Sequence, residues 1–202
     1  MERDRALAAG AALTHTGRRM QALYVLRSGS AKCFSVSTDG EELVRGFCLP
    51  GELIGLEGLA EHRDSCEVVA LEPARYCRIP VRRFEFLMDI LPGLRREVVR
   101  MLSQSLEVSS RTRTRLISTD ASTRVAGFLL DLARRLERRG ILPHEFELSM
   151  TRRDIARHLG LTVETVSREL SSFKRAGWLD VRARQISILA PGALASLSEH
   201  PA

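Results

Sequence analysis

Two spacings of hydrophobic and polar residues divide the chain. From Leu23 to Phe84, short apolar runs are separated by turn signals such as Thr38-Asp39-Gly40 and Pro50-Gly51. Short apolar runs bounded by Gly, Pro and Asp are typical of strands in a β-roll or barrel. From Pro92 onward, apolar residues recur every three or four positions, which is the spacing of amphipathic helices. The pattern therefore predicts an α+β protein with an all-β first half and a mainly helical second half.

The first half is predicted to contain five strands, at residues 22–26, 33–36, 43–47, 66–71 and 76–79. The Thr38-Asp39-Gly40 signal predicts a hairpin between the second and third of these strands. Strands at this spacing favour a jelly roll over residues 21–90. Residues 1–20 are predicted to form a weakly structured leader. Their alanine-rich stretch is too short, and too interrupted by Gly10, for a signal peptide.

Residues 91–118 are predicted to form one long helix that joins two copies of the chain. Along it, apolar and small residues recur at alternating spacings of four and three, the seam of a two-stranded coiled coil. The residues of this predicted dimer seam are Leu94, Val98, Met101, Ser105 and Val108. Val99, Leu102 and Leu106 flank the seam and are predicted to pack against the β-domain. The alternative is a single helix that packs only on its own domain.

Residues 149–178 predict two short helices joined by a tight turn. Thr151 and Thr162 are positioned to cap the N-termini of the two helices. Gly160 and Gly177 are positioned to end them, because glycine enters the left-handed conformation at little cost. Two helices joined in this way form a helix-turn-helix, whose second helix enters the major groove of DNA.

On the second helix, Glu164, Ser167 and Arg168 lie opposite the apolar stripe and are predicted to read bases. An arginine fork matches the O6 and N7 acceptors of guanine, a glutamate accepts from the amino group of cytosine, and a serine bonds either kind of base edge. The alternative is an ordinary solvated helix surface. The order of cap, turn glycine, cap and polar triplet favours base reading.

Beyond Gly177, apolar and polar residues alternate around Arg182 and Arg184, which predicts a β-hairpin wing. Arginines at the tip of a hairpin suit contact with DNA phosphates. The predicted phosphate contacts are Thr151, Arg152, Thr162, Lys174, Arg182 and Arg184. The alternative for each is a solvated surface residue. Residues 119–202 are therefore predicted to be a winged helix-turn-helix domain.

The net charge of +6 is concentrated in the second half of the chain. Residues 91–202 hold 19 Lys and Arg against 12 Asp and Glu, whereas residues 1–90 hold 12 against 13. A basic half joined to a neutral half supports binding of a polyanion, although an arginine-rich genome would also produce an excess. No apolar run is long enough to span a membrane, so a cytoplasmic protein is expected. The five histidines are scattered, without a paired nucleophile or metal-ligand spacing, so no enzyme activity is expected.

Several segments of the chain also resemble those of a known protein family. The segment Thr162-Val163-Glu164-Thr165-Val166-Ser167-Arg168 resembles the recognition helix of the CRP/FNR bacterial transcription regulators, and its Glu-x-x-Ser-Arg pattern is that of the FNR-like branch. The resemblance extends back to Leu23-Tyr24-Val25-Leu26-Arg27-Ser28-Gly29 and covers roughly residues 21–190. It implies a cyclic-nucleotide-binding-type β-roll as sensor, a dimerisation helix and a winged helix-turn-helix.

For function, the resemblance implies a homodimer that binds an inverted repeat of TTGAT half-sites in double-stranded DNA, with RNA polymerase as a protein partner. The alternative is a small-ligand sensor that acts through protein contacts, which the β-roll alone would permit. In the segment that corresponds to the family's nucleotide site, Leu56 stands where a ribose-binding Glu is expected, and Arg63-Asp64 stands where Arg-Ser is expected. An aspartate beside a phosphate would repel it, so cyclic AMP is not the expected effector.

FNR-like members hold a [4Fe–4S] cluster with four cysteines, three ahead of the β-roll and one within it. Only Cys77 matches a cluster ligand in this chain, because residues 1–32 contain no cysteine. One thiolate cannot hold a cluster that needs four, so no cofactor and no metal site are expected, and an iron–sulfur cluster is the alternative. Cys33, Cys48 and Cys66 are predicted to be small buried thiols on strands. The region ahead of residue 21 is shorter than in the family, which indicates either a shortened sensor or a start upstream of Met1.

Overall fold

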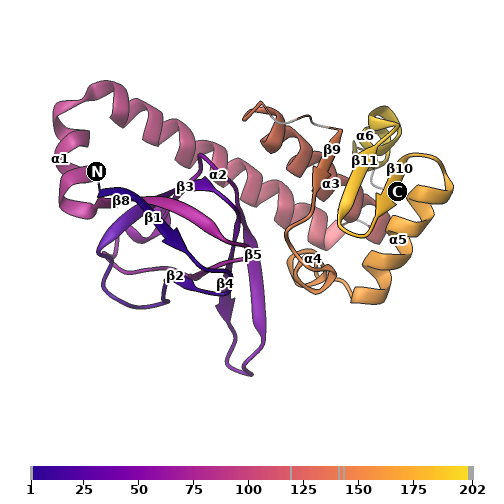
Figure 1. Cartoon of the computed structure of the whole chain (residues 1–202), viewed down its shortest axis with the longest axis horizontal. Coiled ribbons are helices and arrows are strands. Elements are labelled where there is room, and N and C mark those ends of the chain that lie inside the picture. The colour runs from indigo at the N-terminus through magenta and orange to yellow at the C-terminus, as the bar shows by residue number, and fades with distance from the viewer. Residues whose placement is uncertain (1, 119, 141, 143, 200–202) are drawn as a thin grey trace. The chain divides into compact units, whose positions relative to one another are not determined.

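The computed structural model describes residues 2–118, 120–140, 142 and 144–199. The chain forms two compact units, Met1–Ser110 and Arg111–Ala202 (Figure 1). The division falls inside the long helix α2 (Pro92–Ser118), ahead of the predicted boundary near Ser118. Within the described part of the chain, none of the helices combines the length and apolar character needed to cross a lipid bilayer.

The first unit is built on two antiparallel four-stranded sheets, with strand orders β1-β8-β3-β6 and β2-β7-β4-β5. The strands are β1 (Glu2–Leu7), β2 (Ala12–Thr14), β3 (Ala22–Ser28), β4 (Ala31–Val36), β5 (Glu42–Cys48), β6 (Leu53–Ile54), β7 (Glu67–Ala70) and β8 (Ala74–Pro80). A 3-10 turn (Leu56–Gly58), helix α1 (Val81–Ile90) and the start of α2 complete the unit. The predicted β-roll is confirmed.

The predicted hairpin is the pair β4 and β5. Val36 lies opposite Glu42, and Gly40 in the turn has a φ of 80°, a conformation that favours glycine. The hairpin belongs to the sheet β2-β7-β4-β5. Inward-facing residues of this sheet form a core cluster with those of the sheet β1-β8-β3-β6, including Leu26, Ala31, Ile54 and Val68. The roll therefore holds together through side chains that alternate along each strand.

The prediction of a weakly structured leader at residues 1–20 is wrong. Strand β1 pairs with β8, where Leu7 lies opposite Ala74, and strand β2 pairs with β7. The Arg75 guanidinium also binds both carboxylate oxygens of Asp4, at 3.0 Å and 2.6 Å. Strand β1 is charged because it lies at the edge of its sheet, and charged edge strands lack the alternation that identifies a strand in a sequence.

The predicted dimer seam on α2 is also wrong for its first two residues. Val98 is 4% exposed and belongs to a core cluster with Leu23 and Phe84, and Leu94 packs against the same cluster. Met101 is partly buried and Ser105 is exposed, while the side chain of Val108 lies outside the described residues. By contrast, the residues predicted to pack on the roll stay exposed, at 57% for Val99, 39% for Leu102 and 69% for Leu106. Val98 therefore belongs to the core of its own unit, and the three residues predicted to pack on the roll face solvent instead.

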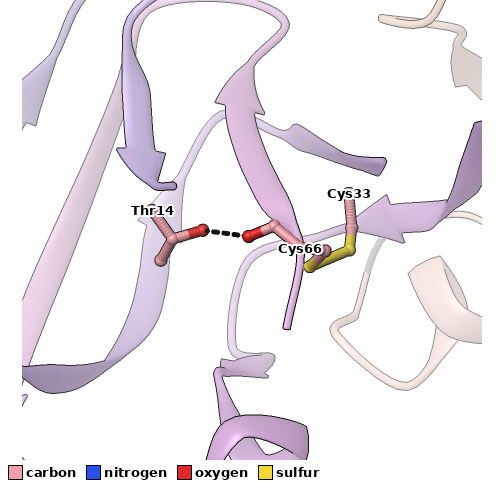
Figure 2. The surroundings of a disulfide bond; sticks show 3 residues. All are labelled: Thr14, Cys33 and Cys66. Atoms are coloured by element: carbon pink, nitrogen blue, oxygen red, sulfur yellow. Dashed lines mark hydrogen bonds between the residues drawn. A yellow bond between two sulfur atoms is a disulfide. The ribbon is translucent and has the colours of Figure 1, made fainter. Parts of the chain in front are cut away.

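Two of the predicted thiols are joined to each other. Cys33, on β4, and Cys66, immediately before β7, form a disulfide (Figure 2), whereas Cys48 and Cys77 keep their thiols. The prediction of small buried thiols is thus wrong for Cys33 and Cys66. Residues far apart in the sequence come together here because β4 and β7 are neighbouring strands.

The second unit is a helical domain with a small antiparallel sheet of order β10-β11-β9. Its elements are α3 (Ala121–Glu137), β9 (Glu145–Glu147), α4 (Arg152–Leu159), α5 (Val163–Arg175), β10 (Leu179–Arg182), β11 (Gln185–Ile188) and α6 (Pro191–Glu199). The core of this unit contains fully buried side chains from four helices and from the sheet, namely Leu129, Ile155, Val166, Ile186 and Leu194. The predicted winged helix-turn-helix architecture is confirmed.

Asp120 caps α3, and its contribution to stability should depend on pH. Its carboxylate accepts from the Thr123 N–H at 2.8 Å and from the Ser122 hydroxyl at 3.1 Å. Hydrogen bonds from the Thr123 backbone and side chain hold the pKa of Asp120 below its usual value. Asp120→Ala should lower the free energy of unfolding of the second unit by about 1 kcal/mol at neutral pH.

Because the folded-state pKa of Asp120 is lowered, this stabilisation is complete above the pKa of the unfolded chain, which is about 3.9. It is then lost as the pH falls through the folded-state pKa. Urea titrations followed by the fluorescence of Trp178, the single tryptophan of the chain, would measure the difference at each pH. Asp120→Asn keeps a capping oxygen and should stay close to the parent protein. If the difference in unfolding free energy between the parent protein and Asp120→Ala grew as the pH fell, the capping role of Asp120 would be contradicted.

Candidate nucleic-acid interface

Helices α4 and α5 each begin with a capped N-terminus and are joined by a short turn that contains a glycine. The Thr151 hydroxyl accepts from the Asp154 N–H at 3.1 Å, and the Asp154 carboxylate accepts from the Thr151 N–H at 3.0 Å, which completes a capping box. Gly160 ends α4 with a φ of 61°, and the Thr162 hydroxyl accepts from the Thr165 N–H at 3.1 Å to begin α5. The predicted caps and turn are confirmed.

Helix α5 presents the predicted base-reading residues on its solvent side. Val166, Leu170 and Phe173 are buried on one face. Glu164 and Arg168, four residues apart, are exposed on the other together with Ser167. The Arg168 side chain is 67% exposed, and its Nε lies 3.5 Å from Oε1 of Glu169 in a loose ion pair. The structure therefore brings the three residues together on one accessible surface.

The three side chains differ in the hydrogen-bonding chemistry that they offer. A backbone hydrogen bond at Glu164 and one from the Thr162 hydroxyl hold the pKa of the Glu164 carboxyl below its usual value, so it acts as an ionised acceptor at neutral pH. The Ser167 hydroxyl donates to the Val163 carbonyl at 2.8 Å, which leaves its oxygen free to accept. Arg168 only donates. The surface thus offers two acceptors for base amino groups and one planar donor fork.

The wing is formed by β10 and β11, and Asp180 of β10 forms an ion pair with Lys174 at the end of α5. Lys174 Nζ lies 3.0 Å from Oδ1 of Asp180 and donates to the Val181 carbonyl at 2.9 Å. Arg182 Nε donates to the other oxygen of Asp180 at 2.8 Å. Hydrogen bonds from Lys174, and then from Arg182, lower the pKa of Asp180. The sequence indicated the two cations but not Asp180, whose role depends on the contact between α5 and β10.

The other predicted phosphate contacts lie around the N-termini of α4 and α5 and at the wing tip. Thr151 and Thr162 are exposed, but their hydroxyls serve as helix caps. Arg152 is partly buried, and its Nη2 approaches the Ala183 carbonyl of the wing at 3.5 Å. Burial lowers the pKa of its guanidinium. Arg184 is exposed. The six phosphate contacts stay predictions.

Ala183 occupies the wing turn with a φ of 53°, which costs a residue with a Cβ about 1–2 kcal/mol. Ala183→Gly should therefore raise the free energy of unfolding of the second unit, by roughly 0.5–1 kcal/mol after the added entropy of the unfolded chain is subtracted. Urea unfolding followed by Trp178 fluorescence measures this change. The same substitution at Ala176, whose φ is −73°, should destabilise instead. Equal destabilisation by both substitutions would contradict the strain at Ala183.

The roll contains a small cavity of about 50 Å³, lined by Gly55, Glu57 and Asp64 among others. Burial raises the pKa of the Asp64 carboxyl, and a hydrogen bond from the His15 backbone partly offsets this. The neighbouring Arg63 points its Nη1 to the Gly17 carbonyl at 2.8 Å. The segment expected to face a nucleotide phosphate therefore places a carboxyl group in the cavity and commits its arginine to a backbone contact.

The cysteines do not fit a four-iron cluster. Cys33 and Cys66 bind each other, and Cys77 is buried on β8, in the sheet that does not contain β4. Among the residues that the structure describes, no group of three or more His, Cys, Asp or Glu side chains is arranged to hold a metal ion.

Comparisons with known proteins agree with this architecture. The family model of the cyclic nucleotide-binding domain matches residues 4–90, and that of the Crp-like helix-turn-helix domain matches residues 123–197. The chain is 36% identical over 200 residues to the fumarate and nitrate reduction regulatory proteins of Salmonella typhi and Escherichia coli, covering 99% of this chain and 80% of each relative. The structure of FixK2 from Bradyrhizobium japonicum is similar over the full length of both chains, with a TM-score of 0.91 and 27% identity. A CRP/FNR family regulator from Thermus thermophilus shares the fold, with a TM-score of 0.75 at 22% identity over 99% of this chain and 100% of that one.

Proposed function

This chain belongs to the CRP/FNR family of DNA-binding transcription regulators, and we propose that it acts as a homodimer on an inverted repeat of TTGAT half-sites. The observation that carries the proposal is the surface of α5, on which Glu164, Ser167 and Arg168 are exposed together above a buried apolar face. The N-terminal part of the second helix is the part of a helix-turn-helix that meets base edges.

A TTGAT half-site contains one G·C pair, which suits two of these side chains. Its guanine offers O6 and N7 to the Arg168 fork, and its cytosine offers an amino group to the ionised Glu164 carboxylate. Ser167 then accepts from an adenine amino group, because its own hydrogen is engaged with Val163. Lys174, Arg182 and Arg184 lie at the end of α5 and on the wing, and in the proposal they contact phosphates that set the register.

The dimer in this proposal forms through the exposed apolar face of α2, defined by Val99, Leu102 and Leu106. These residues are three and four apart, the spacing at which two parallel helices interlock. An inverted repeat has twofold symmetry, which a symmetric dimer matches with one recognition helix in each half-site. A regulator bound beside a promoter acts on transcription through RNA polymerase, which we propose as the protein partner.

Binding to a labelled palindrome with two TTGAT half-sites tests this function. A scrambled duplex of the same length and base composition is the control, and both are titrated at two salt concentrations. Specific regulators bind their sites about 10³-fold or more tightly than other DNA, and binding to the scrambled duplex should fall steeply with salt. Equal affinity for the two duplexes would overturn the proposed half-site.

A further inference from the structure

We propose that Cys33 and Cys66 form a reversible thiol–disulfide site, oxidised by glutathione disulfide or a similar small disulfide, which controls how the segment 55–66 packs against α2. The site belongs to the first unit, whereas the proposed DNA-reading residues belong to the second. The link to regulation rests on the proposed function, whereas the redox chemistry does not.

The topology of the roll brings the two sulfur atoms together. Cys33 lies opposite Val68 in the β4–β7 pair, so Cys66, two residues before Val68, is its diagonal neighbour on the same face. The Cα atoms are 6.2 Å apart, within the range for a disulfide. On the other side of Cys66, the Thr14 hydroxyl donates to its carbonyl at 3.0 Å and fixes the backbone (Figure 2).

The redox conditions of the compartment that contains the DNA determine whether this disulfide is permanent or reversible. Glutathione and thioredoxin keep thiols reduced there, and disulfides that do form are usually transient and catalytic or redox-sensing. A transcription regulator has to meet DNA in that compartment. A disulfide in its sensor domain is therefore expected to open and close with the redox state of the cell.

The two cysteines differ in exposure, which sets the order of the chemistry. Cys33 is partly exposed and Cys66 is 7% exposed. The Cys33 thiolate attacks one sulfur of glutathione disulfide, forms a mixed disulfide and releases one glutathione thiolate. The Cys66 thiolate then attacks the Cys33 sulfur and displaces the second glutathione. Two cysteine thiols are oxidised, one glutathione disulfide is reduced to two glutathione molecules, and these carry away the two protons.

Cys66 ends a tightly folded segment that reaches the helix α2. Leu56 and Leu59 of this segment pack against the core cluster that contains Met20 and Val98, and Val98 belongs to α2. The backbone of the segment is closely packed at Gly58, where a Cβ would lie only 2.3 Å from the Arg63 carbonyl oxygen.

The segment is also hydrogen-bonded to residues 18–20, which precede β3. Met20 N–H donates to the His62 carbonyl, and Asp64 N–H donates to the Arg18 carbonyl, both at 2.9 Å. Opening the disulfide removes the covalent link between this end of the segment and β4, while the β4–β7 hydrogen-bond ladder from Glu67 onward stays in place. The change is passed through a contiguous set of packed side chains to the helix that carries the proposed dimer face.

Peptide mapping of the full-length protein tests the redox site without any variant. Protein equilibrated anaerobically in glutathione buffers is quenched with acid, alkylated and digested with trypsin. The four cysteines fall in separate tryptic peptides, 33–45, 46–63, 64–75 and 76–78. We expect peptides 33–45 and 64–75 to become linked in one reversible transition as glutathione disulfide rises. A link that never forms, or one that persists in the most reducing buffer, would overturn the site.

The coupling to α2 is tested by sedimentation and by binding to the palindrome, each with oxidised and reduced protein. We expect the two states to differ at least threefold in dimer or DNA affinity. Cys33→Ser should abolish the difference, and Cys77→Ser, which alters a thiol on the other sheet, should keep it. Identical affinities in the two states would overturn the coupling. Absence of palindrome binding in both states would instead count against the proposed function, and the peptide link would still decide the redox site.

Discussion

Replacing Arg168 with alanine should remove most of the preference for the palindrome while leaving weak, salt-sensitive binding to DNA. The side chain is 67% exposed on the solvent side of α5, so its loss leaves the packing of the helix intact. One bidentate contact to guanine is worth about 1–3 kcal/mol, and a dimer makes it twice. The affinity for the palindrome should therefore fall by roughly 30-fold to 20,000-fold. The affinity for scrambled DNA should change little.

Two further variants separate the loss of the fork from the loss of charge. Arg168→Lys keeps the positive charge but not the planar pair of donors, so it should fall between the parent protein and Arg168→Ala. Arg83→Ala removes one exposed arginine from α1 in the first unit and should leave the preference unchanged. Fluorescence anisotropy with both duplexes measures all three variants. An Arg168→Ala protein that kept its full preference would show that the guanine is read elsewhere.

Leu102→Glu should convert the proposed dimer into a monomer. In the dimer, two copies of this residue meet on the exposed face of α2, so the substitution would bury two like charges. Each buried, unpaired charge costs several kcal/mol, so the dimer should be weakened by at least about 4 kcal/mol, or roughly a thousand-fold. Sedimentation velocity at micromolar concentration measures this. Affinity for the palindrome should fall with it, because a monomer engages only one half-site.

Gln104→Glu is the matched control, because it adds the same charge on the same helix. Gln104 is exposed and lies two residues from both Leu102 and Leu106, a separation at which side chains do not share a helix face. It should stay dimeric. A Leu102→Glu protein that remained dimeric, with Gln104→Glu behaving alike, would rule out this face of α2 as the dimer interface.

The helix-turn-helix could be predicted almost residue by residue, because its signals are local. Thr151, Gly160 and Thr162 act within a few residues of themselves, through caps and a left-handed turn. Glu164, Ser167 and Arg168 share a face through helical geometry alone. The hairpin of β4 and β5 was predictable for the same reason, since Gly40 marks its turn.

The errors lie where partners are distant in sequence. Strand β1 is ordered by pairing with β8, about seventy residues later, and its charged residues show no sequence pattern that predicts this pairing. Cys33 and Cys66 are 33 residues apart, and only the adjacency of β4 and β7 makes them neighbours. Asp180 likewise gains its role from the packing of the wing on α5.

Helix α2 shows most clearly which features follow from the sequence and which depend on tertiary packing. Its length and its apolar repeats follow from the order of residues, because helical spacing is a local property. Val98 and Val99 are adjacent, however, and each belongs to an apolar stripe with nearly the same repeat. Which stripe faces inward depends on Leu23 and Phe84, which the fold places beside Val98. The amino-acid order thus specified a helix with three exposed polar residues on one face and a connecting helix with two apolar stripes. Tertiary packing selected which stripe of the connecting helix stays exposed, because burial depends on neighbours that periodicity cannot reveal.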